Sequence, residues 1–190
     1  MKIITLLGSP RIKGNTAKIL GKFEELAIAK GHKIDRINIV KYKLNGCLGC
    51  DKCKPVIDEP GCIQKDDMML LFDRMIAADV IIYATPLYAW DFTAQMKTLI
   101  DRQYCLVKNY DTPAYKSFLK DKPVALLVTC GAAIENNADL IPVIFKRECN
   151  YTGSRVIGPY IAPCCTTPAA PGRWADETAR KMADEILADI

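Results

Sequence analysis

The sequence has no apolar run long enough to cross a bilayer. Its longest apolar runs cover residues 80–90 and 124–128, whereas a membrane-spanning helix needs roughly 20 residues. No basic region precedes the first apolar segment, residues 3–7, and no small-residue cleavage site follows it, so we predict no signal peptide. We therefore expect a cytoplasmic protein with no membrane partner.

Histidine and surplus charge are also scarce. His32 is the only histidine and follows Gly31, a residue type common at helix ends, so we expect it to be exposed and inert. The 26 basic and 22 acidic residues are well mixed and leave a net charge of +4, which does not favour a nucleic-acid partner. With 190 residues, 50% hydrophobic and 25% charged, the chain is expected to form one globular domain over residues 1–190.

Cysteine, by contrast, is abundant. The chain has nine cysteines, an odd number, which without an export signal indicates metal binding, redox chemistry or burial rather than a disulfide framework. Residues 41–65 form a long segment without periodicity that contains Cys47, Cys50, Cys53 and Cys62. Three thiolates at intervals of three residues, completed by a fourth, suit a 4Fe–4S cluster. Structural zinc, free thiols and a redox disulfide are the alternatives.

Apolar strands alternate with amphipathic helices along the chain. The pattern predicts strands at residues 3–7, 33–39, 80–83, 124–128 and 155–160. It predicts helices at residues 15–30 (capped by Asn15 or Thr16), 66–78 and 93–107, before Cys149, and after a turn at 164–172. This alternation indicates a doubly wound α/β fold with a five-stranded parallel sheet in the order 2-1-3-4-5 and helices on both faces. Ligands of such folds bind at the carboxyl ends of the strands, beside the switch point.

The loop after the first strand, residues 8–16, carries groups that can bind an anion. Ser9 and Thr16 offer hydroxyls, Asn15 an amide and Arg11 a guanidinium, and backbone N–H groups are free where the helix begins. A phosphate suits this set best, although an ordinary capped turn is the simpler interpretation. The loop is neither GxGxxG nor GxxxxGKS, which argues against a Rossmann dinucleotide site and a P-loop.

Gly8-Ser9-Pro10-Arg11 followed by Gly14-Asn15-Thr16 resembles the FMN phosphate loop of the flavodoxin-like NAD(P)H-dependent FMN reductases, a family that includes the iron–sulfur flavoproteins. The resemblance covers most of the chain up to about residue 131. It implies a flavodoxin-like fold that binds FMN. The residues that it implies for the phosphate are Ser9, Arg11, Gly14, Asn15 and Thr16.

Two later loops continue this resemblance and imply contacts with the flavin ring. The implied residues are Pro86, Leu87, Tyr88 and Trp90 after the third strand, and Thr129, Cys130 and Gly131 after the fourth. From the residues alone, Tyr88, Trp90 and Phe92 can equally fill a core or a dimer interface, and Cys130 a small apolar gap. The helix that follows the aromatic loop also matches the family, and we expect Asp101 and Arg102 to form a surface pair or a subunit contact.

The resemblance implies an enzyme, an FMN-dependent oxidoreductase of the NAD(P)H-dependent FMN or quinone reductase type. In the iron–sulfur subgroup, a 4Fe–4S cluster on Cys47, Cys50, Cys53 and Cys62 would relay electrons to a small-molecule or protein acceptor. Hydride transfer needs no acid or base from the protein, so we expect no catalytic side chain. Because the ring must be shielded, we expect a homodimer or homotetramer. The alternatives are a non-enzymatic electron carrier and a ligand-free signalling or scaffold domain.

Overall fold

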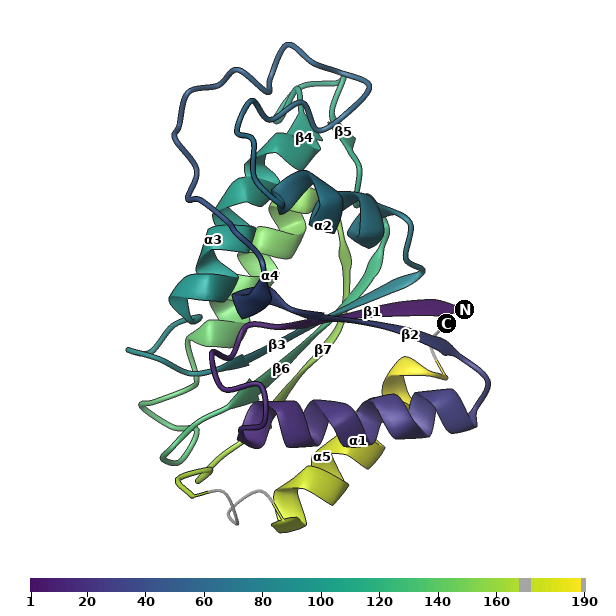
Figure 1. Ribbon diagram of the computed structural model, residues 1–190, viewed down its shortest axis with the longest axis vertical. Helices are drawn as coiled ribbons and strands as arrows, with labels where there is room; N and C mark the ends of the chain where they lie inside the picture. The colour runs from purple at the N-terminus through teal and green to yellow at the C-terminus, as the bar shows by residue number, and fades with distance from the viewer. Residues whose placement is uncertain (168–171, 189–190) are drawn as a thin grey trace.

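The computed structural model describes residues 1–167 and 172–188, and its centre is a five-stranded parallel sheet (Figure 1). The strand order is β2-β1-β3-β6-β7, and every neighbouring pair is parallel. The strands are β1 (Lys2–Leu7), β2 (Lys33–Asn38), β3 (Val80–Pro86), β6 (Pro123–Thr129) and β7 (Arg155–Ala162). In chain order this is 2-1-3-4-5, so the predicted fold class and strand order are confirmed.

Helices cover both faces of the sheet. One face is covered by α1 (Asn15–Ala29) and α5 (Gly172–Ile186), and the other by α2 (Met68–Ile76), α3 (Ala94–Arg102) and α4 (Ile141–Thr152), as Figure 1 shows. Within the residues that the structure describes, no helix combines the length and apolarity of a membrane span.

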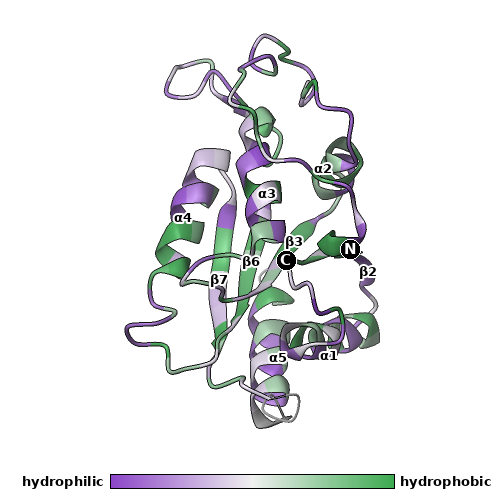
Figure 2. Cartoon of the chain, turned by 60° about the vertical axis from the view of Figure 1, so that its left-hand side comes forward, coloured by the Kyte–Doolittle hydropathy of each residue, from purple (hydrophilic) through white to green (hydrophobic). Residues whose placement is uncertain are grey.

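The side chains on the two faces of the sheet pack into two separate hydrophobic cores. In β1, Ile4 and Leu6 pack with α2, α3 and α4, whereas Ile3 and Leu7 pack with α1 and α5, and all four side chains are fully buried. This explains why the central strands are almost continuously hydrophobic (Figure 2). Burying a side chain of this size contributes about 1.5–3 kcal/mol to the free energy of unfolding. The sheet is therefore a rigid base for the loops at its carboxyl edge.

Several predicted boundaries are wrong. The N-cap of α1 is Gly14, which has no side chain to accept a hydrogen bond, so neither Asn15 nor Thr16 caps the helix. The predicted helix 93–107 ends as α3 at Arg102 and continues as a 3-10 turn, η2 (Gln103–Leu106). Then β4 (Val107–Lys108) pairs with β5 (Lys116–Ser117) in an antiparallel ribbon that periodicity did not predict.

Tertiary contacts explain this ribbon. The Nζ of Lys108, a fully buried side chain, donates to the carbonyl oxygens of Cys53 and Pro60 at 2.7 and 2.9 Å, which holds β4 under the cysteine loop. His32 is half-buried, not exposed as predicted. Of the turn predicted at residues 164–172, residues 168–171 lie outside the described part of the chain.

Gly8, which follows β1, lies at a crowded junction of β1, β3 and α3. Its N–H donates to the carbonyl oxygen of Ala84 at 2.8 Å, and its own carbonyl accepts from the Thr93 hydroxyl at 2.7 Å. A Cβ added at Gly8 would lie 2.7 Å from the Cβ of Met96, in the first turn of α3. The approach of α3 to the sheet therefore requires glycine at this position.

We expect Gly8→Ala to lower the free energy of unfolding by about 1–3 kcal/mol, the usual cost of overpacking a core. The measurement is the urea unfolding midpoint. Gly46→Ala is the matched control, because an added Cβ there meets nothing within 4 Å, and its effect should be under about 0.5 kcal/mol. Equal midpoints for the two variants would contradict the crowding argument.

Candidate functional site

A cavity of about 580 Å³, the edge cavity, opens at the carboxyl ends of the strands. It lies beside the switch point between β1 and β3, where the topology predicts a ligand. All residues predicted for the cofactor except Trp90 line it: Ser9, Arg11, Gly14, Asn15, Thr16, Pro86, Leu87, Tyr88, Thr129, Cys130 and Gly131. Three loops that are distant in the sequence therefore meet around one space.

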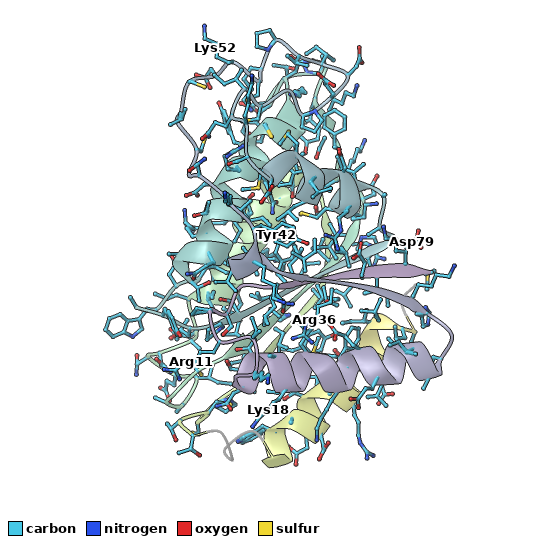
Figure 3. All side chains as sticks on the ribbon, viewed as in Figure 1. Arg11, Lys18, Arg36, Tyr42, Lys52 and Asp79 are labelled. Atoms are coloured by element: carbon cyan, nitrogen blue, oxygen red, sulfur yellow. The ribbon has the colours of Figure 1, made fainter. Side chains whose placement is uncertain are left out.

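The β1–α1 loop is ordered by its own hydrogen bonds. The Ser9 hydroxyl accepts from the Arg11 N–H at 3.1 Å and is almost fully buried, and the Gly14 N–H donates to the Arg11 carbonyl at 2.9 Å. Because the N-cap is a glycine, no N-cap side chain satisfies the first-turn N–H groups of α1. Figure 3 shows the exposed Arg11 near this helix start. The loop thus offers donors and positive charge to an anion.

Side-chain hydrogen bonds join the loops of the edge cavity. The hydroxyls of Thr16 and Thr129 are 2.7 Å apart, which links the start of α1 to the end of β6. Asn15 donates through Nδ2 to the carbonyl oxygens of Cys165 and Thr167, both at 3.0 Å. The prediction missed Cys165, Thr166 and Thr167, which also line the cavity. Their position after β7, at the same sheet edge, is the signal that could have found them.

The aromatic loop after β3 divides its residues between the cavity and solvent. Tyr88 and Asp91 exchange two backbone hydrogen bonds of 3.0 Å across a turn in which Ala89 and Trp90 both have positive φ. Tyr88 lines the edge cavity, but Trp90 does not and is 64% exposed, so contact between Trp90 and a ring stays a prediction. Phe92 is buried in the core, as its alternative interpretation proposed.

Cys130 is buried at the end of β6, and its Sγ donates to the Ala132 carbonyl at 3.3 Å. Burial raises the pKa of this thiol, which keeps it protonated at neutral pH. Cys130 is therefore both an apolar filler and a residue of the cavity wall.

A second, small cavity of about 20 Å³, the thiol cavity, collects the cysteines of the long loop. Cys47, Cys50, Cys53 and Cys62 all line it, together with the buried Cys105 of the 3-10 turn η2. Figure 3 shows Lys52, between Cys50 and Cys53, at the end of the molecule opposite Arg11. The two cavities are therefore separate sites.

The thiol cavity has the donors of a metal centre but not its geometry. All nine cysteines are free thiols. Across residues 1–167 and 172–188, no three His, Cys, Asp or Glu side chains are arranged to hold a metal ion. Burial raises the pKa of Cys53 and raises that of Cys105 to about 12, so both are neutral thiols without a metal. The donor set fits a thiolate-ligated centre, and Cys47 and Cys50, which would complete it, are exposed.

The prediction for Asp101 and Arg102 is wrong. Asp101 pairs with Lys97 on the surface of α3, one turn away. Arg102 is only 1% exposed and forms a buried ion pair with Asp66 at 2.8 Å. Asp101 and Arg102 are both hydrophilic, so the sequence does not indicate that one is exposed and the other buried. Arg102 is buried because the cysteine loop lies over it.

A doubly wound parallel sheet with an uncapped helix start and an aromatic loop at its carboxyl edge defines a flavodoxin-like α/β protein. Within this class, the chain belongs to the NADPH-dependent FMN reductase family, whose sequence profile matches residues 1–154. The predicted family is thereby confirmed.

Relatives of known name support the subgroup that the cysteines suggested. An iron–sulfur flavoprotein of Archaeoglobus fulgidus is 38% identical over 102 residues, which are 54% of this chain and 45% of the relative. An iron–sulfur flavoprotein of Methanosarcina thermophila is 38% identical over 133 residues, which are 70% of this chain and 64% of the relative. The chain therefore covers about half to two thirds of the length of these relatives.

Solved structures confirm the fold. An NAD(P)H:quinone oxidoreductase from Methanothermobacter marburgensis superposes with a TM-score of 0.74 at 17% identity, over 97% of this chain and 93% of the other. At this identity the likeness establishes the shared architecture.

Proposed function

We propose that this protein is an FMN-dependent oxidoreductase that takes a hydride from NAD(P)H. The observation that carries the proposal is the edge cavity, in which an uncapped helix start, Arg11 and two further loops of a confirmed FMN reductase family meet. Its volume of about 580 Å³ falls within the roughly 300–1,000 Å³ typical of cofactor sites. We propose a small molecule or a partner protein as the electron acceptor.

The edge cavity has a charged part, which would bind the phosphate of FMN, and an apolar part, which would bind its ring. Ser9, Arg11 and the first N–H groups of α1 would hold the phosphate. Pro86, Leu87 and Tyr88 on one side and Gly131 on the other would contact the ring. A bound flavin supplies the hydride acceptor, so the protein's part is to orient the ring and limit access to it.

The residues of the thiol cavity support the proposal of a second cofactor. We propose that Cys47, Cys50, Cys53 and Cys62 hold a 4Fe–4S centre, because their donor chemistry fits and the relatives above are named iron–sulfur flavoproteins. The same cavity favours the electron carrier as the second candidate function. We also propose a homo-oligomer, because Tyr88 of the edge cavity is 44% exposed and Trp90, two residues further along, is 64% exposed, so a second subunit can cover both side chains and shield a ring.

Anaerobic mixing with NADPH or NADH separates the enzyme from the carrier. We expect the flavin absorbance of the FMN-loaded protein to bleach within seconds in a stopped-flow measurement. Dithionite, which reduces any accessible flavin, is the positive control. Bleaching by dithionite but by neither nicotinamide would identify a carrier, and a protein that does not bind FMN at all would refute both.

Arg11→Met should weaken FMN binding about ten- to a hundredfold, because a charge-assisted hydrogen bond is worth about 1.5–3 kcal/mol. Riboflavin, which lacks the phosphate, should bind the variant and the wild-type protein equally. Quenching of flavin fluorescence measures both affinities. Lys18→Met is the matched control, since Lys18 is exposed on α1 but does not line the edge cavity. A parallel loss of riboflavin affinity would show that Arg11 does not recognise the phosphate.

Cys50→Ser should remove the iron and acid-labile sulfide of anaerobically purified protein and leave FMN bound, because the two cavities share no residue. Iron, sulfide and flavin assays on the same sample test this. Cys164→Ser, which replaces another exposed cysteine that does not line the thiol cavity, should retain all three. Loss of FMN from the Cys50 variant would contradict the separation of the sites.

A further inference from the structure

Arg102, the last residue of α3, forms hydrogen bonds with both ends of the cysteine loop, the segment between Asn45 and Asp66. Its Nη1 donates to the Asn45 carbonyl and to Asp66 Oδ2, both at 2.8 Å, and its Nη2 donates to Asp66 Oδ1 at 3.2 Å. Asn45 precedes Cys47 and Asp66 follows Cys62, so one guanidinium holds the two points where the loop leaves and rejoins the domain. Burial alone would raise the pKa of Asp66, but the hydrogen bonds from Arg102 and from the backbone lower it, so this carboxylate stays charged.

The third nitrogen of this guanidinium, Nε, lacks a hydrogen-bond partner in the part of the chain that the structure describes. The Nε of Arg102 is buried and makes no hydrogen bond within the described residues, although an unsatisfied buried donor costs about 1–3 kcal/mol and more on a charged group. Arg102 lines the thiol cavity, and Cys62 lies close to it: burial lowers the pKa of Arg102, while Asp66 and Cys62 raise it above the ordinary value. The acceptor for this donor is therefore expected among the sulfur atoms of this cavity, where Cys62 already interacts with the guanidinium.

Two lysines add positive charge around the same cavity. Lys108 donates to the carbonyl of Cys53, and Lys54 donates to the carbonyls of Tyr104 and Val107 at 2.8 and 2.9 Å. Burial lowers the pKa of both lysines. Within the described residues, the hydrogen bonds of both ammonium groups go to carbonyl or hydroxyl oxygens rather than to carboxylates. Cations placed in this way favour an anionic occupant.

We propose that Arg102 is a positioning residue for the sulfur-ligated centre, and that its Nε–H donates a hydrogen bond to a sulfur atom of that centre. This inference rests on the proposed function of the four loop cysteines. The guanidinium has two roles: its Nη atoms hold the loop ends, and its Nε binds the occupant. Hydrogen bonds to sulfur raise the reduction potential of such centres.

Arg102→Lys tests the Nε–H, because lysine keeps a positive charge for Asp66 but carries all its donors on one terminal nitrogen and has none at the position of Nε. We expect the variant to lose iron to a chelator about ten- to a hundredfold faster than the wild-type protein, as is usual when an outer hydrogen bond to a ligand is removed. Its centre should also have a more negative midpoint potential and an altered electron paramagnetic resonance signal after reduction. FMN content and the melting temperature report whether the variant is folded.

Two further variants separate this role from a purely structural one. Asp66→Asn weakens the hold of Arg102 on the loop ends but keeps the Nε–H and leaves the positive charge of Arg102 unpaired, so its midpoint potential should not become more negative. Arg74→Lys is the control, because Arg74 pairs with Asp35 on β2 and neither residue lines the thiol cavity. This variant should change neither the midpoint potential nor the rate of iron loss. An unchanged potential and resonance signal in Arg102→Lys, or the same shift in Asp66→Asn, would overturn the proposal.

A folding defect and an empty centre give distinct results. If Arg102→Lys does not fold, the double variant Arg102→Met/Asp66→Asn removes the ion pair without leaving a buried charge, and the same shift in potential is expected. If wild-type protein reconstituted with iron and sulfide holds neither, the proposed function of the cysteines fails, and this inference fails with it. Iron in the wild-type protein with an unaltered centre in the variants overturns the role of Arg102 alone.

Discussion

The hydroxyl of Thr93 is the interaction on which the arrangement of the edge cavity depends. It is fully buried, donates to the carbonyl of Gly8 and accepts from the N–H of Met96, while the Thr93 N–H reaches the Thr85 hydroxyl. One side chain thus caps α3 and holds the ends of β1 and β3 against it. Such buried, fully paired groups are costly to disrupt, so the loops above them keep a fixed relation.

The helix α3 connects two sites whose positive charges differ in their exposure to water. Its nine residues span about 13 Å, with the edge cavity near the first turn and the thiol cavity near the last. The edge cavity is open, and its main charge, Arg11, is exposed and screened by water. Around the thiol cavity, Arg102 and Lys108 are buried, where charges interact far more strongly.

Local patterns predicted some features well. The apolar strands and the Gly31 helix end follow from periodicity and backbone preference, which act over a few residues. The cavity-lining role of Tyr88 followed from a motif. The exposure of Trp90 did not, because it depends on the tight turn from Tyr88 to Asp91, which turns one aromatic toward the cavity and leaves its neighbour in solvent.

The sequence by itself determined the parallel sheet, its order and the edge at which the edge cavity opens, because strand composition and crossover handedness leave few alternatives. Only the tertiary structure decided that Cys105 and Arg102 join the cysteine loop. Arg102 and Asp66 are 36 positions apart, and both look like surface residues in the sequence. Burial of a charged side chain depends on what packs over it, and that is a property of the folded chain rather than of any short segment.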